Sequence, residues 1–206
     1  MSITFAICVI TCVVSFQGFK NPDFRWKLIF HPYTIKRNPK EWTRFFTSGF
    51  IHLDWAHLAF NMLALYSFGK NLEEHYYPMA FGQYAKMHYI ILYFGALIVS
   101  VLASYIKNKD NQNYAALGAS GAISAVVFAC ILFNPLSEIL LFFIPMKGIY
   151  FAIIYLAFSS YASKKNLGNI GHDAHFFGAI FGLAYTLVFK PEIFYWFVSQ
   201  LKTLFN

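Results

Sequence analysis

Six long apolar segments follow one another along the chain, and they constrain its fold more than any other feature. A helix that spans a bilayer needs about 20 mainly apolar residues, and each segment approaches that length. Charged residues make up only 12% of the chain, against about 25% in soluble domains, which excludes an ordinary soluble enzyme, a disordered chain and a coiled coil. We therefore predict an all-α integral membrane protein, a compact bundle of six transmembrane helices. The predicted spans are Ile3–Phe19, Trp55–Glu73, Tyr89–Ile106, Gly118–Phe133, Pro145–Ser160 and Ala174–Phe189.

Six spans leave no room for a separate soluble domain, so we expect residues 1–206 to form a single membrane domain. The first segment lacks the positive start and the small-residue cleavage site of a signal peptide, which predicts a retained helix. The apolar stretch Ile139–Ile144 is expected to lead into the fifth span. Tyr161–Gly171 is predicted to be a solvated fifth loop, and Pro191–Asn206 to lie along the membrane interface.

Residues 20–54 are too long for a simple connector and too apolar for a mobile one, so we predict a large structured first loop at the membrane interface. Seven of the sixteen basic residues lie between Lys20 and Arg44, among aromatic side chains. That mixture is typical of contact with lipid headgroups, and we expect no nucleic-acid partner. The cysteines show no metal-ligand spacing, so no metal and no cofactor is predicted.

Charge does not settle which way the bundle faces. With a cytoplasmic N-terminus, loops one, three and five lie outside and carry most of the Lys and Arg residues. The positive-inside rule favours the opposite orientation. The imbalance disappears when the first loop, which we expect to fold onto the membrane, is left out.

Polar residues inside spans are costly and therefore mark functional candidates. His57 and Asn61 lie four residues apart in the second span, so they share one helix face. The pair is suited to donating hydrogen bonds to a single acceptor. The alternative is a pair of hydrogen bonds that hold neighbouring helices together.

The fourth span begins with a serine between small residues, Gly118-Ala119-Ser120-Gly121. A hydroxyl with so little cover is easily approached. Gly121, Ala125 and Ala129 form a stripe of small residues that permits another helix to pack closely. A packing motif without chemistry is the alternative reading of this segment.

The sixth span carries His175 one turn before Gly178, with Gly182 continuing the small-residue face. Two helices with glycine faces can bring the Ser120 hydroxyl and the His175 imidazole within hydrogen-bond distance. A serine hydroxyl becomes a good nucleophile only when a base such as neutral histidine takes its proton. Together the motifs hold the parts of a serine hydrolase.

In these motifs the chain resembles the rhomboid family of intramembrane serine proteases, from the first loop to the sixth span. The matching motifs, in chain order, are Arg44-Phe-Phe-Thr-x-x-Phe-Ile-His52, His57-x-x-x-Asn61, Gly69-x-x-x-Glu73, Gly118-x-Ser120-Gly121 and Ala174-His175-x-x-Gly178-x-x-x-Gly182.

The resemblance implies a peptidase with a catalytic dyad, in which Ser120 is the nucleophile and His175 the base. It implies an oxyanion site made of the His57 and Asn61 side chains and the backbone N–H groups of Ala119 and Ser120. The expected substrates are single-pass membrane proteins, cut in or near a transmembrane helix in the lipid bilayer. The family topology implies an active site open to the extracytoplasmic side, and we expect a bacterial cytoplasmic membrane.

Two positions depart from the family pattern. Many rhomboids carry a tyrosine four residues after the nucleophile that stacks on the catalytic histidine, whereas this chain has Ser124 there. The orientation of the His175 ring must then come from elsewhere, and a Ser124 hydrogen bond is one source. Asp173 lies two residues before His175 and in a helix points away from it, so a triad is not expected.

The sequence fits three other functions less well. A rhomboid-like protein that binds transmembrane helices without cutting them has no need to keep Ser120, His175 and Asn61 together. A transporter or channel predicts inverted repeats and paired broken helices, and the sequence shows neither. A metalloprotease is disfavoured because the chain has no His-Glu-x-x-His motif.

Overall fold

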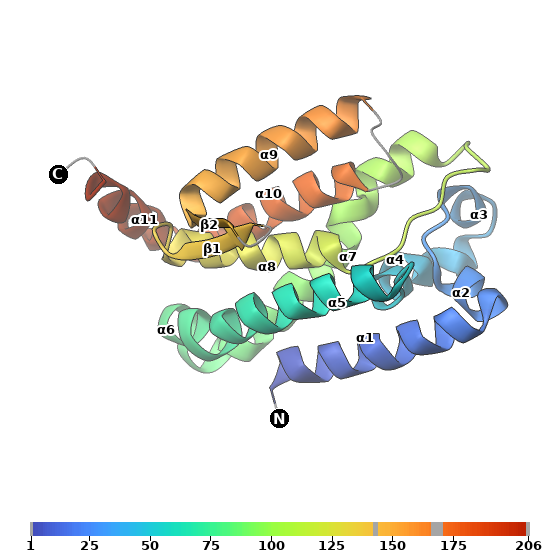
Figure 1. Cartoon of the computed structure of the whole chain (residues 1–206), viewed down its shortest axis with the longest axis horizontal. Helices are drawn as coiled ribbons and strands as arrows, with labels where there is room; N and C mark the ends of the chain where they lie inside the picture. The colour runs from blue at the N-terminus through green and yellow to red at the C-terminus, as the bar shows by residue number, and fades with distance from the viewer. Residues whose placement is uncertain (1, 142–143, 166–170, 205–206) are drawn as a thin grey trace.

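The computed structural model describes residues 2–141, 144–165 and 171–204, and most of them are helical (Figure 1). The first half contains α1 (Ile3–Lys20), α2 (Pro22–Leu28), α3 (Pro32–Arg37), η1 (Pro39–Thr43), α4 (Arg44–Thr47), η2 (Ser48–Phe50), α5 (Trp55–Ala64), η3 (Leu65–Gly69), η4 (Leu72–Tyr76), α6 (Tyr77–Phe81) and η5 (Gly82–Tyr84). The second half contains α7 (Ala85–Asn108), α8 (Ser120–Phe133), β1 (Glu138–Leu141), β2 (Ile144–Lys147), α9 (Gly148–Lys165), α10 (His172–Phe189) and α11 (Glu192–Lys202). The prediction of an α-helical protein is confirmed.

Helix α8 lies at the centre of the bundle, between α5 and α10 (Figure 1). Every residue from Gly121 to Phe133 is buried. Because five of the first six residues of α8 are glycine, alanine or serine, neighbouring helices can approach its backbone closely. The helix that begins with Ser120 is therefore enclosed by other helices rather than by lipid.

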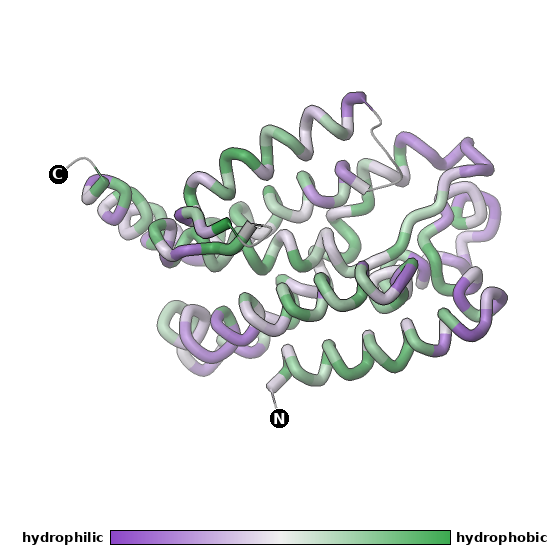
Figure 2. Tube along the Cα trace, in the orientation of Figure 1, coloured by the Kyte–Doolittle hydropathy of each residue, from purple (hydrophilic) through white to green (hydrophobic). Residues whose placement is uncertain are grey.

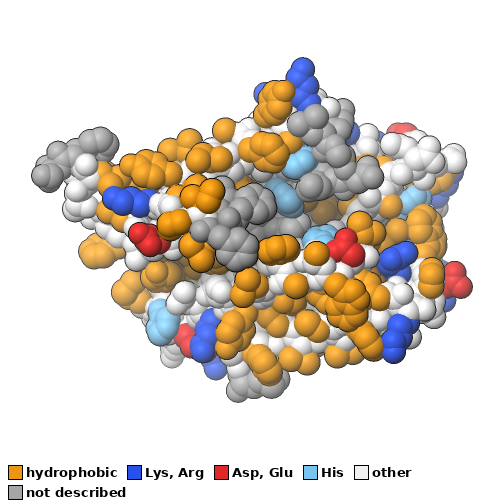
Figure 3. Space-filling view, viewed as in Figure 1, with side chains coloured by type: hydrophobic (Ala, Val, Ile, Leu, Met, Phe, Trp, Pro, Cys, Tyr) orange, Lys and Arg blue, Asp and Glu red, His pale blue; other side chains and the backbone are white. Residues whose placement is uncertain are grey.

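The outward faces of the outer helices are apolar. Figure 2 shows hydrophobic residues along the helices and hydrophilic residues gathered near their ends and in the loops. Figure 3 shows hydrophobic side chains over much of one face, with histidines visible between α9 and α5. Exposed large apolar residues of α1 and α9 include Phe5, Val9, Ile10, Val13, Phe16, Ile153, Ile154 and Phe158. Such continuous exposed apolar surface fits a protein surrounded by lipid.

Length and composition identify fewer crossings than the six predicted. Among the described residues, Ile3–Lys20 and Trp55–Asn108 are long and apolar enough to cross a membrane. The second stretch turns back at Gly82, whose φ of 54° is a conformation that favours glycine. Helices α10 and α11 qualify only together, and they are bent by 114° relative to each other. The count of six spans therefore stays a prediction, and α8, with 14 residues, is one of the shorter apolar helices.

The predicted first loop contains the short helices from α2 to η2. Arg44 is buried at its centre, where Nη1 donates to the carbonyl oxygens of Trp26 at 2.6 Å and Ile29 at 2.9 Å. Its Nε donates to Glu41 at 2.6 Å. A buried guanidinium is stable only when its donors are satisfied, so this residue fixes the fold of the segment. Its position at the membrane interface stays a prediction.

Two boundaries in the second half were predicted wrongly. The stretch Ile139–Ile144 does not lead into a helix, because β1 and β2 pair as an antiparallel hairpin with Leu140 opposite Pro145. Proline lacks an N–H, so it is tolerated on the edge of such a hairpin and disfavoured in the interior of a helix. Helix α9, which corresponds to the predicted fifth span, accordingly begins at Gly148. The predicted fifth loop is also shortened, because α9 continues to Lys165. Residues 166–170 of that loop lie outside the described residues.

Candidate active site

Contacts between two loops hold the backbone in front of Ser120. Phe30 and Ala116 exchange two backbone hydrogen bonds of 2.9 Å, which joins the first loop to the segment between α7 and α8. The N–H of Gly118 donates to the carbonyl oxygen of Ser48 at 2.8 Å. With its φ of 111°, Gly118 turns the chain into α8 in a conformation that L side chains rarely adopt. The nucleophile candidate therefore stands at a fixed helix start.

The structure places His175 beside Ser120. The His175 Nε2 atom lies 2.8 Å from the Ser120 Oγ atom, which is the distance of a hydrogen bond. Ser120 begins α8 and His175 lies in the first turn of α10, so both polar groups are at the same end of the bundle (Figure 1). This arrangement permits the hydroxyl to pass its proton to the imidazole.

Glycine makes that distance possible. A Cβ atom added to Gly178 would overlap the backbone of Gly121, with its carbonyl carbon only 2.8 Å away. A Cβ atom added to Gly182 would overlap Ala125 in the same way, 2.6 Å from its Cα atom. The backbones of α8 and α10 therefore touch along the predicted small-residue stripes, directly below the Ser120 and His175 side chains.

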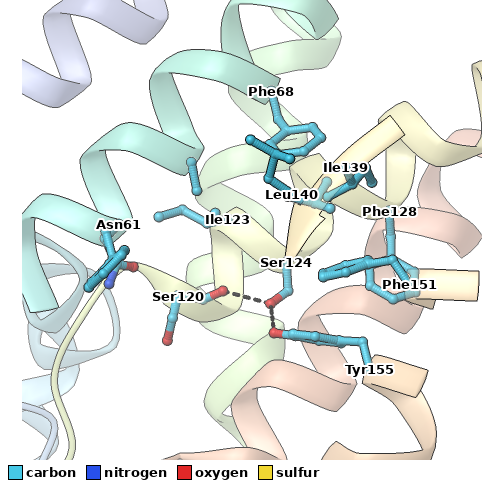
Figure 4. Close-up of a pocket in the computed structure, with 13 residues that line it drawn as sticks. Asn61, Phe68, Ser120, Ile123, Ser124, Phe128, Ile139, Leu140, Phe151 and Tyr155 are labelled. Atoms are coloured by element: carbon cyan, nitrogen blue, oxygen red, sulfur yellow. Dashed lines mark hydrogen bonds between the residues drawn. The ribbon is translucent and has the colours of Figure 1, made fainter. Parts of the chain in front are cut away.

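The predicted oxyanion donors lie around the same position, with some of their hydrogen bonds already made within the protein. The Asn61 Nδ2 atom donates to the carbonyl oxygen of His57 at 2.8 Å, one turn earlier on α5. The His57 ring packs on Gly118, so that an added Cβ there would lie 2.8 Å from the His57 Cε1 atom. Asn61 and Ser120 line one cavity (Figure 4).

The third predicted donor, the N–H of Ala119, faces a histidine that the sequence did not assign to the site. It lies 3.4 Å from the Nε2 atom of His52. His52 is completely buried, and its Nδ1 atom lies 3.0 Å from the Ser15 Oγ atom. The Ser15 hydroxyl donates to the carbonyl oxygen of Phe50 at 3.0 Å, so the His52 Nδ1–H donates to Ser15 and its Nε2 atom accepts from Ala119.

Such a pattern of hydrogen bonds needs a neutral ring. Burial, with a smaller contribution from His57, lowers the pKa of His52 to about 3, so the ring is neutral at neutral pH. His52 thus joins α1 to the loop in front of Ser120. The signal that could have found it was present, since His52 closes the first of the matching motifs.

Asp173 does not complete a triad. Its carboxylate is hydrogen bonded to Ser163 of α9 and lies 3.8 Å from the Lys107 Nζ atom. Both His172 and Asp173 belong to the first turn of α10. The carboxylate therefore connects α10 with α9 and α7, and the part of the chain that the structure describes holds no carboxylate on His175.

A tyrosine occupies the face of the His175 ring. The Tyr155 ring of α9 stacks on it, with the centroids 6.0 Å apart and the planes inclined by 24°. Ser124 contacts Tyr155 and not His175: its Oγ atom lies 2.5 Å from the Tyr155 hydroxyl oxygen and donates to the carbonyl oxygen of Ser120 at 2.8 Å (Figure 4). The expected hydrogen bond from Ser124 to the histidine is thus replaced by a contact through Tyr155.

A cavity of about 260 Å³ opens beside Ser120 (Figure 4). Ser120 and Asn61 lie at its polar end, and the remaining wall is mostly apolar. The wall is formed by Phe60, Ala64, Phe68, Ile123, Ser124, Val127, Phe128, Ile139, Leu140, Phe151 and Tyr155. The described residues contain no group of three or more His, Cys, Asp or Glu side chains suited to a metal ion. The site can hold an apolar peptide segment next to a hydroxyl and an imidazole.

Comparisons with known proteins agree with these features. A family model described as the Rhomboid domain matches residues 39–192. The chain is 34% identical to Rhomboid protease GluP of Bacillus subtilis over 144 residues, 70% of this chain and 26% of that protein. It is 30% identical to Putative rhomboid protease YdcA of the same organism over 154 residues, 74% of this chain and 70% of that protein.

The chain is also similar to a plant protein. RHOMBOID-like protein 12, mitochondrial, of Arabidopsis thaliana is 28% identical over 143 residues, 65% of this chain and 42% of that protein. The chain thus spans about a quarter of the length of GluP and about two fifths of the plant protein. Because the domain match covers most of the chain and includes both Ser120 and His175, this integral membrane protein belongs to the rhomboid family.

Proposed function

We propose that this protein is an intramembrane serine protease, in which Ser120 and His175 hydrolyse peptide bonds in or near transmembrane helices of other membrane proteins. The observation that carries the proposal is the 2.8 Å contact between the Ser120 Oγ and His175 Nε2 atoms at the starts of α8 and α10. Relatives named rhomboid proteases support it.

In the proposed reaction, the Ser120 Oγ atom attacks the carbonyl carbon of the scissile bond while its proton passes to the His175 Nε2 atom. The protonated imidazole then gives this proton to the leaving amine, and the C–N bond breaks. A water molecule, deprotonated by the same imidazole, hydrolyses the acyl-enzyme and restores the serine. No carboxylate partner is required in this sequence of steps.

The negative charge on the tetrahedral intermediate needs hydrogen-bond donors close to Ser120. We assign this role to the Asn61 amide and the His57 ring, together with backbone N–H groups at the start of α8. The Ala119 N–H is occupied by His52 in the resting protein, so its use would require a small shift of that ring or of the oxyanion toward it.

The proposed substrates are single-pass membrane proteins. A peptide segment must unwind to place its carbonyl group beside Ser120, so helices with small or helix-destabilising residues are the expected substrates. We further propose that the active site faces the extracytoplasmic side of a bacterial cytoplasmic membrane. Relatives from Bacillus subtilis support the bacterial assignment, while another relative carries a mitochondrial name.

A rhomboid-like protein that only binds transmembrane helices would not need the contact between Ser120 and His175, so this geometry favours the protease. The test is cleavage of a tagged single-pass substrate by purified protein in liposomes. Ser120→Ala and His175→Ala are each expected to abolish cleavage. Ser199→Ala and His75→Ala, which change exposed residues of the same types, are expected to cleave normally. Cleavage by Ser120→Ala at the unaltered rate would refute the assignment.

A further inference from the structure

The hydrogen bond to Ser120 does not by itself fix the orientation of the His175 ring. Among the described residues, its hydrogen bond is the one to Ser120, and the carboxylate of Asp173 is bound elsewhere. An imidazole held at one nitrogen can still tilt about that contact. The Nε2 atom must nevertheless point at the Ser120 hydroxyl for proton transfer, because small displacements of reacting groups cost about 10²-fold in rate.

Tyr155 supplies a flat surface against which the ring can lie. The two rings are nearly parallel, inclined by 24°, and the Tyr155 ring also packs against Phe151 and Phe128, which contact each other. Its ring stacks on Phe151 with centroids 5.4 Å apart, and lies 5.5 Å from the Phe128 ring. A side chain that packs against two other rings has little freedom to rotate, so it can restrict the tilt of His175.

The hydroxyl of Tyr155 is fixed as well, and the direction of its hydrogen bond can be deduced. Ser124 has one hydroxyl hydrogen, and it is donated to the carbonyl oxygen of Ser120 at 2.8 Å. The Tyr155 hydroxyl must therefore be the donor in its 2.5 Å contact with the Ser124 Oγ atom. A chain of two hydrogen bonds thus joins the Tyr155 ring to the backbone of the nucleophile candidate itself (Figure 4).

We propose that Tyr155 and Ser124 form a positioning pair that sets the orientation of the His175 ring relative to Ser120. The proposal rests on the dyad chemistry proposed above. It explains the departure at position 124: the small, buried Ser124 leaves space for an aromatic ring from α9, and its hydroxyl anchors that ring. The stacking surface that the family pattern places on the helix of the nucleophile is here contributed by a different helix.

One consequence is that three helices define the dyad. Ser120 and Ser124 come from α8, His175 from α10 and Tyr155 from α9. Ser124 and Tyr155 are argued to act through the His175 ring, so both are positioning residues. Ser124 and Tyr155 also belong to the cavity wall, and Tyr155→Phe and Ser124→Ala change its shape little. These two variants should therefore lower kcat for peptide cleavage and leave KM nearly unchanged.

The test measures the second-order rate of labelling by a fluorophosphonate in liposomes, with thermal unfolding as a check on folding. Tyr155→Leu removes the stacking surface and is expected to slow labelling by about 10²-fold. Tyr155→Phe and Ser124→Ala each remove one hydrogen bond and keep the ring, so a loss of roughly 3- to 10-fold is expected. Tyr161→Leu and Tyr150→Phe, on the exposed side of the same helix, serve as controls without an effect.

The double variant Ser124→Ala/Tyr155→Phe separates positioning from general stability. If the two side chains act as one unit, the double variant is no slower than the slower single variant. If the losses in labelling rate multiply in the double variant, the two side chains act independently and the proposed pair is refuted. A normal labelling rate in Tyr155→Leu at a temperature at which this variant is folded would also refute it. If Tyr155→Leu does not fold, the double-mutant cycle of Ser124→Ala and Tyr155→Phe tests the proposal instead.

A measurement that does not depend on enzyme activity tests this proposal separately from the proposed function. In NMR spectra of the protein with labelled histidine, the ring protons of His175 should move when Tyr155→Leu removes the stacked ring. They should stay nearly unchanged in Tyr161→Leu. An unshifted His175 signal in Tyr155→Leu would refute the stacking. If the unaltered protein shows no labelling that depends on Ser120, the proposed protease fails, and the NMR comparison still decides the geometry of the pair.

Discussion

A methyl group added at Gly178 has no space, and this makes Gly178→Ala a sharp test of how the two helices set the dyad. The new Cβ atom would lie 2.8 Å from the carbonyl carbon of Gly121 and closer still to its oxygen, whereas ordinary contact requires 3.4–4 Å. Since the obstacle is backbone and not a side chain that can rotate away, α10 must withdraw from α8 by about 1 Å. The distance between Ser120 Oγ and His175 Nε2 would then grow from 2.8 Å to beyond hydrogen-bond range.

Two magnitudes follow from this displacement. Forcing an extra carbon into a close-packed interface typically costs about 1–3 kcal/mol of stability, which lowers the unfolding temperature without abolishing the fold. The displacement of the reacting groups by about 1 Å is expected to lower the rate of substrate cleavage by about 10²-fold. Gly178→Leu, with a much larger side chain, is expected to be inactive.

The assay combines thermal unfolding in detergent with cleavage of a single-pass substrate in liposomes, below the unfolding temperature of each variant. Gly95→Ala is the matched control: it is also a glycine in a helix, but its Cβ would meet only the movable side chain of Phe181, at 3.1 Å. It is expected to cleave nearly normally. A folded Gly178→Ala protein that cleaves as fast as the unaltered protein would refute the reasoning that the glycine contact sets the dyad distance.

Three further predictions concern other parts of the site. Asn61→Ala is expected to lower kcat for cleavage by about 10²-fold through loss of one oxyanion donor, whereas the exposed Asn71→Ala should cleave normally; equal rates would leave Asn61 a purely structural role. Protein stability is expected to fall as the pH drops from about 6.5 toward 3, because the unfolded His52 takes up a proton in this range and the folded one, with its pKa lowered to about 3, does not. Thermal unfolding of His52→Gln should show a shallower fall, and an unchanged slope would count against a buried neutral ring. Single cysteines at Asn38 and Asn113, in a cysteine-free background, should react with an impermeant thiol reagent in intact cells, and protection of both until lysis would place the active site in the cytoplasm.

The sequence predicted best what depends on spacing within a helix. Residues four apart share a helix face, so the Gly178 and Gly182 stripe could be inferred without coordinates, and it touches Gly121 and Ala125 in the structure. The common location of Ser120 and His175 at one end of the bundle follows similarly, because helices two apart in a simple up-and-down bundle run parallel.

Contacts between distant segments could not be predicted in this way. Tyr155 is one of 14 tyrosines, and no local pattern marks it as the partner of Ser124 and His175. Its role depends on the rotation and register of α9 against α8, which emerge only from packing. His52 is similar, since its partners Ser15 and Ala119 lie far from it in the chain.

The hairpin was missed for a different reason. A short apolar run such as Ile139–Ile144 suits either a strand or a buried helix, and periodicity alone does not distinguish them. Pro145 is a signal against a helix that continues through this point, but a proline is also tolerated at the start of a helix, so it fits a span that begins there equally well. The same ambiguity shifted the predicted start of the fifth span to Pro145, ahead of the start of α9 at Gly148.

The central claim is that Ser120 is a nucleophile activated by His175, and the most direct measurement is the location of a covalent adduct. Purified protein in liposomes is treated with a fluorophosphonate, digested and sequenced by mass spectrometry. A single adduct on Ser120 is predicted, absent from Ser120→Ala and strongly reduced in His175→Ala, because phosphonylation needs the serine proton to be taken up. An adduct on another serine, or equal modification of Ser120 in the protein without His175, would contradict the claim.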